Sequence, residues 1–207
     1  MDRNKTIFLI RHGESIHNRD GNQLSGLTDV AMSLEGIKQC QLLARRIDRF
    51  QIQRVYSSPL SRAIETANII FPNLKIFMEK GLIEFNYGEY EGKIANKING
   101  DPIIDHWNHS PGNLTFPGGD NTATHAGQIY TALKDIAQSS NETPIACITH
   151  RTSMRLLIAK ILEIPLNKFR SIPCSNCSLT EVYVNENGEL SIVTLNVTLK
   201  YLTEINP

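Results

Sequence analysis

The stretch IFLIRHGE at residues 7–14 begins with four apolar residues and continues directly into Arg11-His12. A strand without a polar face is typical of a parallel sheet that is covered by helices on both sides. The stretch IACITH at residues 145–150 has the same character and also ends in a histidine, His150. These two stretches therefore predict two buried strands, each followed by a histidine.

Four further short runs, bounded by turn residues, predict the rest of the sheet. They are Val55 to Ser57, Leu74 to Phe77, Leu179 to Val184 and Leu190 to Val193. Asn187-Gly188 lies between the last two runs and predicts an antiparallel hairpin at one edge of the sheet.

Apolar residues recur with helical spacing between these strands. This spacing runs from Leu34 to Ile47 and from Leu60 to Phe71, and further helices are predicted from Thr122 to Gln138 and from Ser153 to Leu162. Ser33 and Ser58 are the expected N-caps of the first two, with Pro59 at the first helical position of the second. The alternation predicts an α/β fold: a three-layer α/β/α sandwich around a mostly parallel six-stranded sheet with an antiparallel edge.

The sequence shows no linker, repeat or low-complexity tract, so residues 1–207 are expected to form a single domain. Residues 85–117 contain few apolar runs and many Gly, Pro, Asn and aromatic residues. We expect this excursion to lie as a loop or lid over one end of the sheet, where Tyr87, Tyr90, His106, Trp107 and His109 either line a ligand site or anchor the packing.

Charge and composition exclude several classes of partner. The chain carries 21 basic and 21 acidic residues, a balance that argues against nucleic acid or an anionic membrane surface. Residues 1–6 are charged where a signal peptide needs an apolar core, and no run is apolar for the roughly 18 residues of a membrane span. A cytoplasmic location is expected, and the four cysteines are expected to be free thiols, including the Cys174/Cys177 pair.

His12 and His150 both follow strands at the edge where open α/β sheets bind ligands. Each histidine alone would more often be a structural residue, but two basic neighbours favour a functional role. Arg11 precedes His12, and Arg62 lies in the first turn of a predicted helix, where a cation opposes the helix dipole unless an anion lies nearby. The alternative for Arg62 is an ordinary surface pair with Glu65.

Convergence of Arg11, Arg62 and His150 on His12 would have two consequences. Clustered cations disfavour the imidazolium ion, so His12 is expected to stay neutral near pH 7 with a lone pair available for attack. The same cations bind a phosphoryl group and stabilise the charge on its oxygens during transfer. The charge pattern alone thus predicts a phosphoryl pocket.

Five ordered blocks resemble the histidine phosphatase superfamily, the phosphoglycerate mutase-like proteins. They are residues 9–15 with Asn18, residues 57–63 with Thr66-Ala67, residues 82–84 with Gly88 and Glu91-Gly92, residues 117–120, and Thr149-His150. In pattern the chain is most similar to α-ribazole phosphatases and broad-specificity phosphatases. The resemblance covers nearly the whole chain and implies the phosphoglycerate mutase-like fold.

The resemblance implies a role for each matched residue. His12 is the implied nucleophile that becomes phosphohistidine, Glu84 the implied general acid and base, and Glu89 and Glu91 are the competing carboxylates. Phosphoryl oxygens are implied to be held by Arg11, Arg62, His150 and Asn18, and the substrate-binding set also includes Ser15, Ser25 and Gly26. No metal and no other cofactor is implied, because the arginines neutralise the phosphate charge.

Arg151 departs from the family, which usually carries Gly after the second histidine, and Asp120 stands where Glu is common. We expect Arg151 to add a cation to the pocket and to favour a substrate with a second anionic group; the alternative is that it points to solvent. The predicted activity is hydrolysis of phosphate monoesters of small metabolites. A phosphoglycerate mutase-type phosphotransferase and an inactive phosphate-binding module are the alternatives, and the sequence makes no prediction of oligomeric state.

Overall fold

The computed structural model describes residues 4–20, 23–94, 97–98 and 100–204. Residues 1–3, whose charge entered the prediction of location, lie outside this range. Six strands form one sheet: β1 (Lys5–Arg11), β2 (Arg54–Ser57), β3 (Ile76–Met78), β4 (Ile145–Thr149), β5 (Leu179–Val184) and β6 (Leu190–Val197).

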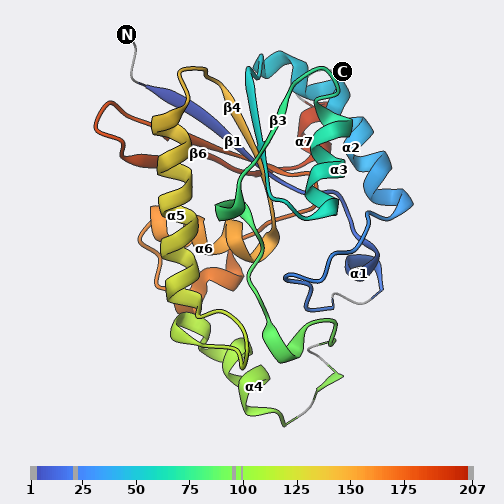
Figure 1. The fold of residues 1–207 in the computed structure, drawn as a ribbon, viewed down its shortest axis with the longest axis vertical. Coiled ribbons are helices and arrows are strands. Elements are labelled where there is room, and N and C mark those ends of the chain that lie inside the picture. The colour runs from blue at the N-terminus through green and yellow to red at the C-terminus, as the bar shows by residue number, and fades with distance from the viewer. Residues whose placement is uncertain (1–3, 21–22, 95–96, 99, 205–207) are drawn as a thin grey trace.

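The order of strands in the sheet is β3-β2-β4-β1-β5-β6. The first four of these are parallel to one another, whereas β5 runs antiparallel to β1 and β6 runs antiparallel to β5. The predicted α/β fold, with a six-stranded sheet and an antiparallel hairpin at its edge, is confirmed (Figure 1).

The helices connect the strands and cover both sides of the sheet. They are α1 (Ile16–Arg19), α2 (Leu34–Ile47), α3 (Ser61–Ile70), α4 (Pro102–His109), α5 (Thr122–Ser139), α6 (Arg151–Ile161) and α7 (Leu199–Glu204). Short 3-10 helices are η1 (Asp48–Phe50), η2 (Lys80–Leu82), η3 (Gly88–Tyr90), η5 (Pro111–Asn113) and η6 (Leu166–Ser171). The bounds of α2 agree with the prediction, and the Ser33 side chain caps it by accepting a hydrogen bond from the Gly36 N–H.

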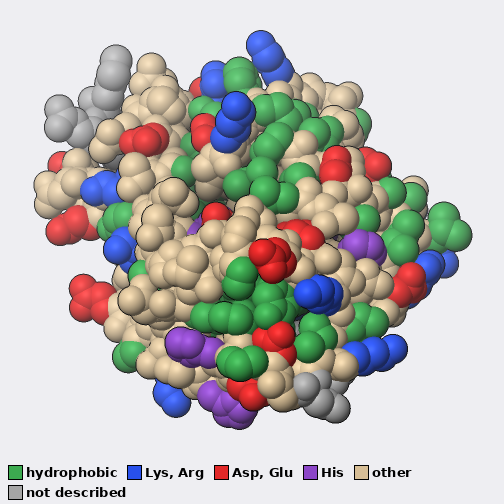
Figure 2. Space-filling view, turned by 60° about the horizontal axis from the view of Figure 1, so that its bottom comes forward, with side chains coloured by type: hydrophobic (Ala, Val, Ile, Leu, Met, Phe, Trp, Pro, Cys, Tyr) green, Lys and Arg blue, Asp and Glu red, His purple; other side chains and the backbone are tan. Residues whose placement is uncertain are grey.

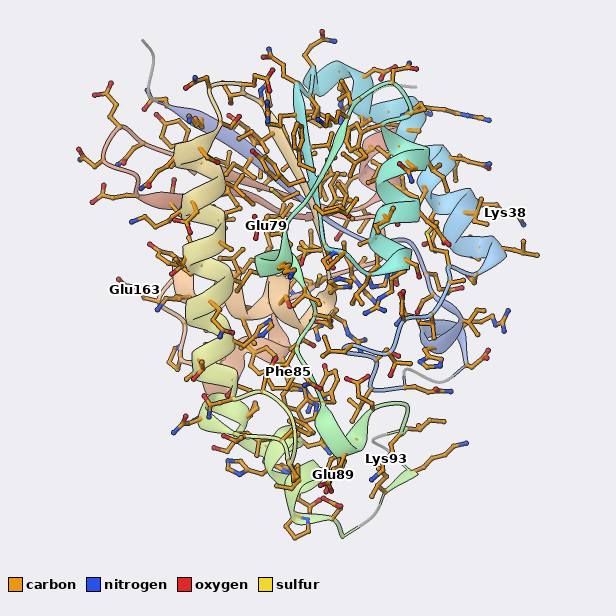
Figure 3. The ribbon with its side chains drawn as sticks, viewed as in Figure 1. Lys38, Glu79, Phe85, Glu89, Lys93 and Glu163 are labelled. Atoms are coloured by element: carbon orange, nitrogen blue, oxygen red, sulfur yellow. The ribbon has the colours of Figure 1, made fainter. Side chains whose placement is uncertain are left out.

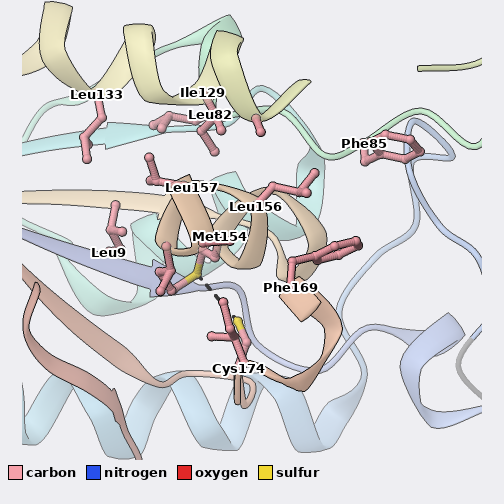
Figure 4. Close-up of a cluster of buried hydrophobic side chains, with 14 of the residues drawn as sticks. Leu9, Leu82, Phe85, Ile129, Leu133, Met154, Leu156, Leu157, Phe169 and Cys174 are labelled. Atoms are coloured by element: carbon pink, nitrogen blue, oxygen red, sulfur yellow. Dashed lines mark hydrogen bonds between the residues drawn. The ribbon is translucent and has the colours of Figure 1, made fainter. Parts of the chain in front are cut away.

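The uninterrupted apolar run of β1 serves two separate cores. Because successive side chains of a strand point to opposite faces, Ile7 and Leu9 join one buried cluster and Phe8 and Ile10 join the other. The first cluster lies under α5 and α6, and Figure 4 shows Leu9 within it beside residues of both helices. The second lies under α2, α3 and α7 on the other side of the sheet (Figure 1).

Two predicted helix starts are wrong. Helix α3 begins at Ser61 rather than at Pro59, and its N-cap is Leu60, which makes no side-chain capping bond. Ser58 does not cap the helix because its hydroxyl bonds the Nε2 atom of His150 at 2.7 Å. Helix α6 begins at Arg151, immediately after His150, rather than at Ser153.

The 85–117 excursion contains a helix that the sequence analysis missed. Asp101 caps α4 by accepting hydrogen bonds from the N–H groups of Ile103 and Ile104, and Pro102 occupies the first turn. Aromatic rings from the excursion then pack edge to face around the fully buried Phe116. The rings in contact with it are those of Phe85, Tyr87, Tyr90 and Trp107. The excursion is therefore anchored through its own apolar core.

The surface shows no strong segregation of charge on the face drawn in Figure 2, where acidic and basic side chains are interspersed. Within the described residues, no helix is both long enough and apolar enough to cross a membrane.

We predict that Phe116→Ala lowers the free energy of unfolding by about 3–5 kcal/mol, because it removes a buried ring and leaves a cavity among four other rings. Leu34→Ala is the matched control: Leu34 is 79% exposed, so a change below about 0.5 kcal/mol is expected. Chemical denaturation of both variants measures the difference. Equal, small changes would show that the aromatic cluster does not support the fold.

Candidate active site

The two histidines meet because β1 and β4 are parallel neighbours. Arg11 pairs with Thr149 in the register of these strands, and the His12 N–H donates to the Thr149 carbonyl at 3.1 Å. Both strands end at the same edge of the sheet, and the ring centroids of His12 and His150 lie 5.1 Å apart. The predicted convergence of the two histidines is therefore present.

His12 is oriented by its own backbone. Its Nδ1 atom lies 2.6 Å from the Gly13 carbonyl, which can only accept, so Nδ1 carries the proton and Nε2 keeps a lone pair. The ring is only 4% exposed. Burial, reinforced by the positive charges of Arg62 and Arg11, lowers the pKa of His12 well below its usual 6.5. The neutral tautomer with a free Nε2 is thus the form present near pH 7.

Arg11 is held between two segments that are distant in sequence. One terminal nitrogen donates to the Cys174 carbonyl at 2.7 Å, and the other lies 3.4 Å from the Asn18 side-chain oxygen. Burial lowers the pKa of Arg11 to about 10, so the guanidinium remains charged at neutral pH. Its Nε atom is buried and has no hydrogen-bond partner among the described residues.

Arg62 is held by backbone carbonyls rather than by Glu65, the alternative partner. Its guanidinium donates to the carbonyls of Ser25, Gly26 and Thr28, at 3.3, 2.9 and 3.0 Å. Glu65 instead accepts a hydrogen bond from the Met32 N–H. Loop residues 25–28 thus supply the ligands of this cation.

Glu91 shapes that loop. Its carboxylate accepts hydrogen bonds from the N–H groups of Gly26, Leu27, Thr28 and Tyr87 and from the Thr28 hydroxyl. A side chain at Gly26 would collide with the Phe85 carbonyl, 2.0 Å from an added Cβ, so only glycine permits this approach. Glu91 is therefore not a solvated loop residue, whereas Glu89 is exposed, at the lower end of the molecule in Figure 3.

Glu84 is the carboxylate that enters the site, and it is 5% exposed. Its Oε1 atom accepts from the N–H of Phe85 and from the N–H and hydroxyl of Ser153, each at 2.9 Å. Its Oε2 atom accepts from the Thr152 N–H at 3.1 Å. Thr152 and Ser153 belong to the first turn of α6, whose free N–H groups favour a negative charge.

Ser15 and Asn18 form a reciprocal cap at the start of α1. The Ser15 side chain accepts from the Asn18 N–H, and the Asn18 side-chain oxygen accepts from the Ser15 N–H. Asn176 also donates to that oxygen. With the oxygen turned toward the protein, the amide nitrogen of Asn18 is the end that can donate to a ligand.

These side chains line one small pocket, in which polar groups predominate. Its lining consists of Arg11, His12, Ser15, Asn18, Gln23, Ser25, Arg62, Glu84, Tyr87, Arg151 and Thr152. Every residue that the sequence predicted for the site lies in this lining except Gly26 and His150. Gly26 contributes its carbonyl to Arg62, and His150 is fully buried, with its Nδ1 atom unpartnered among the described residues.

Gln23 and Thr152 also line the pocket, although the sequence does not predict them, and the sequence leaves the role of Tyr87 open. The Tyr87 hydroxyl bonds the Thr152 hydroxyl at 2.6 Å, which fixes both at the wall of the pocket. Thr152 follows Arg151 directly, a proximity that could have identified it, but Gln23 carries no such signal. Trp107 serves packing, and His106 and His109 are exposed on α4, outside the pocket lining.

All four cysteines are free and buried, as predicted. Cys174 contacts the Met154 sulfur, and Cys177 lies with its sulfur 3.5 Å from that of Cys40. Among the described residues, no group of three or more His, Cys, Asp or Glu side chains is arranged to hold a metal ion.

The chain is similar to known proteins. Residues 7–198 match the histidine phosphatase superfamily, branch 1. Phosphoserine phosphatase 1 of Hydrogenobacter thermophilus is 30% identical over 196 residues, which cover 93% of this chain and 92% of that protein. A probable phosphoglycerate mutase of Yersinia enterocolitica is 27% identical over 191 residues, covering 89% and 87%.

The solved structures agree with this assignment. Phosphoserine phosphatase from Entamoeba histolytica, in complex with 3-phosphoglyceric acid, superposes with a TM-score of 0.84 at 27% identity and covers 95% of this chain and 98% of that one. With a phosphoserine phosphatase at 30% identity and a family match over nearly its whole length, this chain belongs to the histidine phosphatase superfamily and is a phosphoric monoester hydrolase.

Proposed function

We propose that the enzyme transfers the phosphoryl group of a small phosphorylated metabolite to Nε2 of His12 and then releases it to water. The observation that carries the proposal is the 2.6 Å contact between His12 Nδ1 and the Gly13 carbonyl, which leaves Nε2 as the nucleophilic atom. The lowered pKa of His12 supports the same role, because a protonated ring could not attack phosphorus.

Arg11, Arg62 and Asn18 are the proposed ligands of the phosphoryl oxygens. All three line the pocket with His12, and the guanidinium groups supply positive charge where negative charge accumulates during in-line transfer. His150 is proposed to assist from beside His12. Its support is the 5.1 Å separation of the two rings together with its Nδ1 atom, which has no partner among the described residues.

Glu84 is the proposed general acid and base. Oε1 lies within hydrogen-bond distance of three donors, while Oε2 accepts a single backbone hydrogen bond from the described residues and is the oxygen with capacity for another partner. We infer that Oε2 gives a proton to the leaving oxygen and later takes one from the water that attacks phosphohistidine.

We also propose that the substrate carries a second anionic group, which Arg151 binds. Arg151 is half-buried at the first position of α6 and lines the pocket, and its charge is one of those that lower the pKa of His12. Phosphoserine and 3-phosphoglyceric acid, which appear in the names of similar proteins, are both phosphorylated carboxylic acids. A small phosphorylated carboxylic acid is therefore the substrate class we favour.

Hydrolysis rather than mutase activity is the proposed outcome of the reaction. A mutase must retain the phosphorylated acid in a dry site with additional cations. The excursion cations Lys93 and Lys97 do not line the pocket, and Lys93 instead lies over the Tyr90 ring. A cytosolic location is the accompanying proposal, supported by four unpaired thiols.

We predict that His12→Ala loses at least about a thousandfold of the activity on para-nitrophenyl phosphate, because the nucleophile is removed. Rapid quenching of the wild type with a labelled phosphate ester is expected to trap an acid-labile phosphoprotein, and the variant is expected to trap none. Retained hydrolysis in His12→Ala would place the nucleophile elsewhere. A wild-type protein that hydrolyses no phosphate ester would overturn the proposal.

We predict that Arg151→Gly raises the KM for phosphoserine about tenfold and the KM for para-nitrophenyl phosphate less than about twofold, since only phosphoserine carries the carboxylate that Arg151 binds. Arg151→Lys, which keeps the charge, is expected to recover part of the loss. Equal effects on the two substrates would contradict the assignment of Arg151.

We predict that Glu91→Gln lowers kcat/KM about tenfold on either substrate. The amide cannot accept all the hydrogen bonds that Glu91 accepts, so the carbonyls that hold Arg62 lose their position. The matched control is Glu89→Gln on the same short segment, where exposure predicts a change within about twofold. Similar kinetics for the two variants would refute this role of Glu91.

A further inference from the structure

A chain of buried polar groups reaches Glu84 from the side opposite the pocket. Ser153 donates toward Oε1 of Glu84 at 2.9 Å, and its hydroxyl also lies 2.8 Å from Nε2 of His125. The other ring nitrogen of His125 lies 3.1 Å from a carboxylate oxygen of Asp120. The chain therefore runs Asp120, His125, Ser153, Glu84, and neither His125 nor Ser153 belongs to the pocket lining.

The two middle members of this series of hydrogen-bonded groups are buried. His125 is 4% exposed and Ser153 is fully buried, and the His125 ring packs edge to face on Phe85. Uncharged apolar residues would fill this space without the cost of desolvating polar groups. Only Asp120 reaches the surface, since its side chain is 35% exposed. The chain thus links the solvent to Glu84 through groups that the proposed reaction does not itself use.

Asp120 fixes one end of the chain. Although partial burial alone would raise it, the pKa of Asp120 is lowered because His125 and the Asn86 N–H donate to its carboxylate. A carboxylate only accepts, so Nδ1 of His125 carries a proton. Asp120 thus fixes the orientation of the His125 ring, with Nε2 toward the Ser153 hydroxyl.

Ser153 has one hydroxyl hydrogen and three neighbours that can accept it. They are the Ile83 carbonyl at 2.7 Å, Oε1 of Glu84 and Nε2 of His125. His125, held by Asp120, contacts the same hydroxyl that bonds Oε1, so the placement of its ring governs the position of that hydroxyl.

We propose that Asp120, His125 and Ser153 are positioning residues that hold Oε1 of Glu84 and set its hydrogen bonding, so that Oε2 is presented to the leaving oxygen of the substrate. The inference rests on the proposed role of Glu84 as general acid. No bond is formed or broken along the chain, whose effect is on the orientation of the carboxyl group. His125 and Ser153 touch neither the substrate nor His12.

The test compares substrates whose leaving groups differ in their need for an acid. Nitrophenolate leaves para-nitrophenyl phosphate without protonation, whereas the alkoxide of phosphoserine must be protonated as it leaves. The ratio of kcat/KM for the two substrates excludes the later discharge of phosphohistidine, and an unchanged KM for phosphoserine assigns a lowered ratio to the protonation step and not to binding of the carboxylate. A loss of structure would lower both values together.

Ser153→Ala and His125→Leu are expected to lower kcat/KM for phosphoserine about tenfold or more, and for para-nitrophenyl phosphate less than about threefold. His125→Gln and Ser153→Thr, which keep a hydrogen-bonding group, are expected to retain more activity on phosphoserine and provide folded variants if the first two are unstable. Ser140→Ala is the matched control, since Ser140 is also buried directly after α5 and, among the described residues, its hydroxyl bonds the Glu142 backbone.

Glu84→Gln separates the inference from the proposed function. If Glu84→Gln loses phosphoserine hydrolysis selectively but the Ser153 and His125 variants do not, the positioning chain is refuted and the role of Glu84 stands. If Glu84→Gln itself shows no selective loss, the assignment of Glu84 as general acid fails. Selective loss in all three variants, with no change in Ser140→Ala, supports the inference.

Discussion

The parallel pairing of β1 with β4 is the interaction on which the site depends. The two strands are central and buried on both faces, and their register places Arg11 beside Thr149, one residue before each histidine. A shift of the register by one residue would exchange the two apolar faces of β1 and move His12 away from His150. The same hydrophobic constraint that stabilises the sheet therefore determines the distance between the two rings.

The burial of charged side chains in this site costs desolvation free energy. Arg11 and Arg62 are almost completely buried, and an unpaired buried charge is strongly unfavourable. Both are held by backbone carbonyls, and direct carboxylate pairing is not what holds them. Carbonyl dipoles compensate the charge only in part, so each guanidinium retains attraction for an anionic ligand. The positive charge of the pocket is thus fixed in place by the protein, as the proposed binding of a phosphoryl group requires.

Much of the fold and the site could be predicted because the signals are local. The apolar runs gave the strands, and the order of strands and histidines placed His12, Arg11 and Arg62 together. Prediction failed where one side chain had two possible partners. Ser58 has the residue type and spacing of a helix cap, but its hydroxyl bonds His150, which is 92 residues further along the chain. The hydrogen bonds of Glu91 and the place of Gln23 in the pocket were not predicted either, because both depend on contacts made through the tertiary fold.

The carboxylate of Glu91 also connects two segments that would otherwise vary independently. The Gly92 N–H donates to the Leu24 carbonyl, and the Leu24 N–H donates to the Lys93 carbonyl. The loop that holds Arg62 is therefore bonded to the start of the excursion. Changes of length that alter the substrate range within the family would therefore be tolerated at some positions of the chain and not at others. Insertions beyond residue 93 leave this tie intact, whereas a change of length between Glu84 and Glu91 would separate the proposed general acid from the loop that holds Arg62.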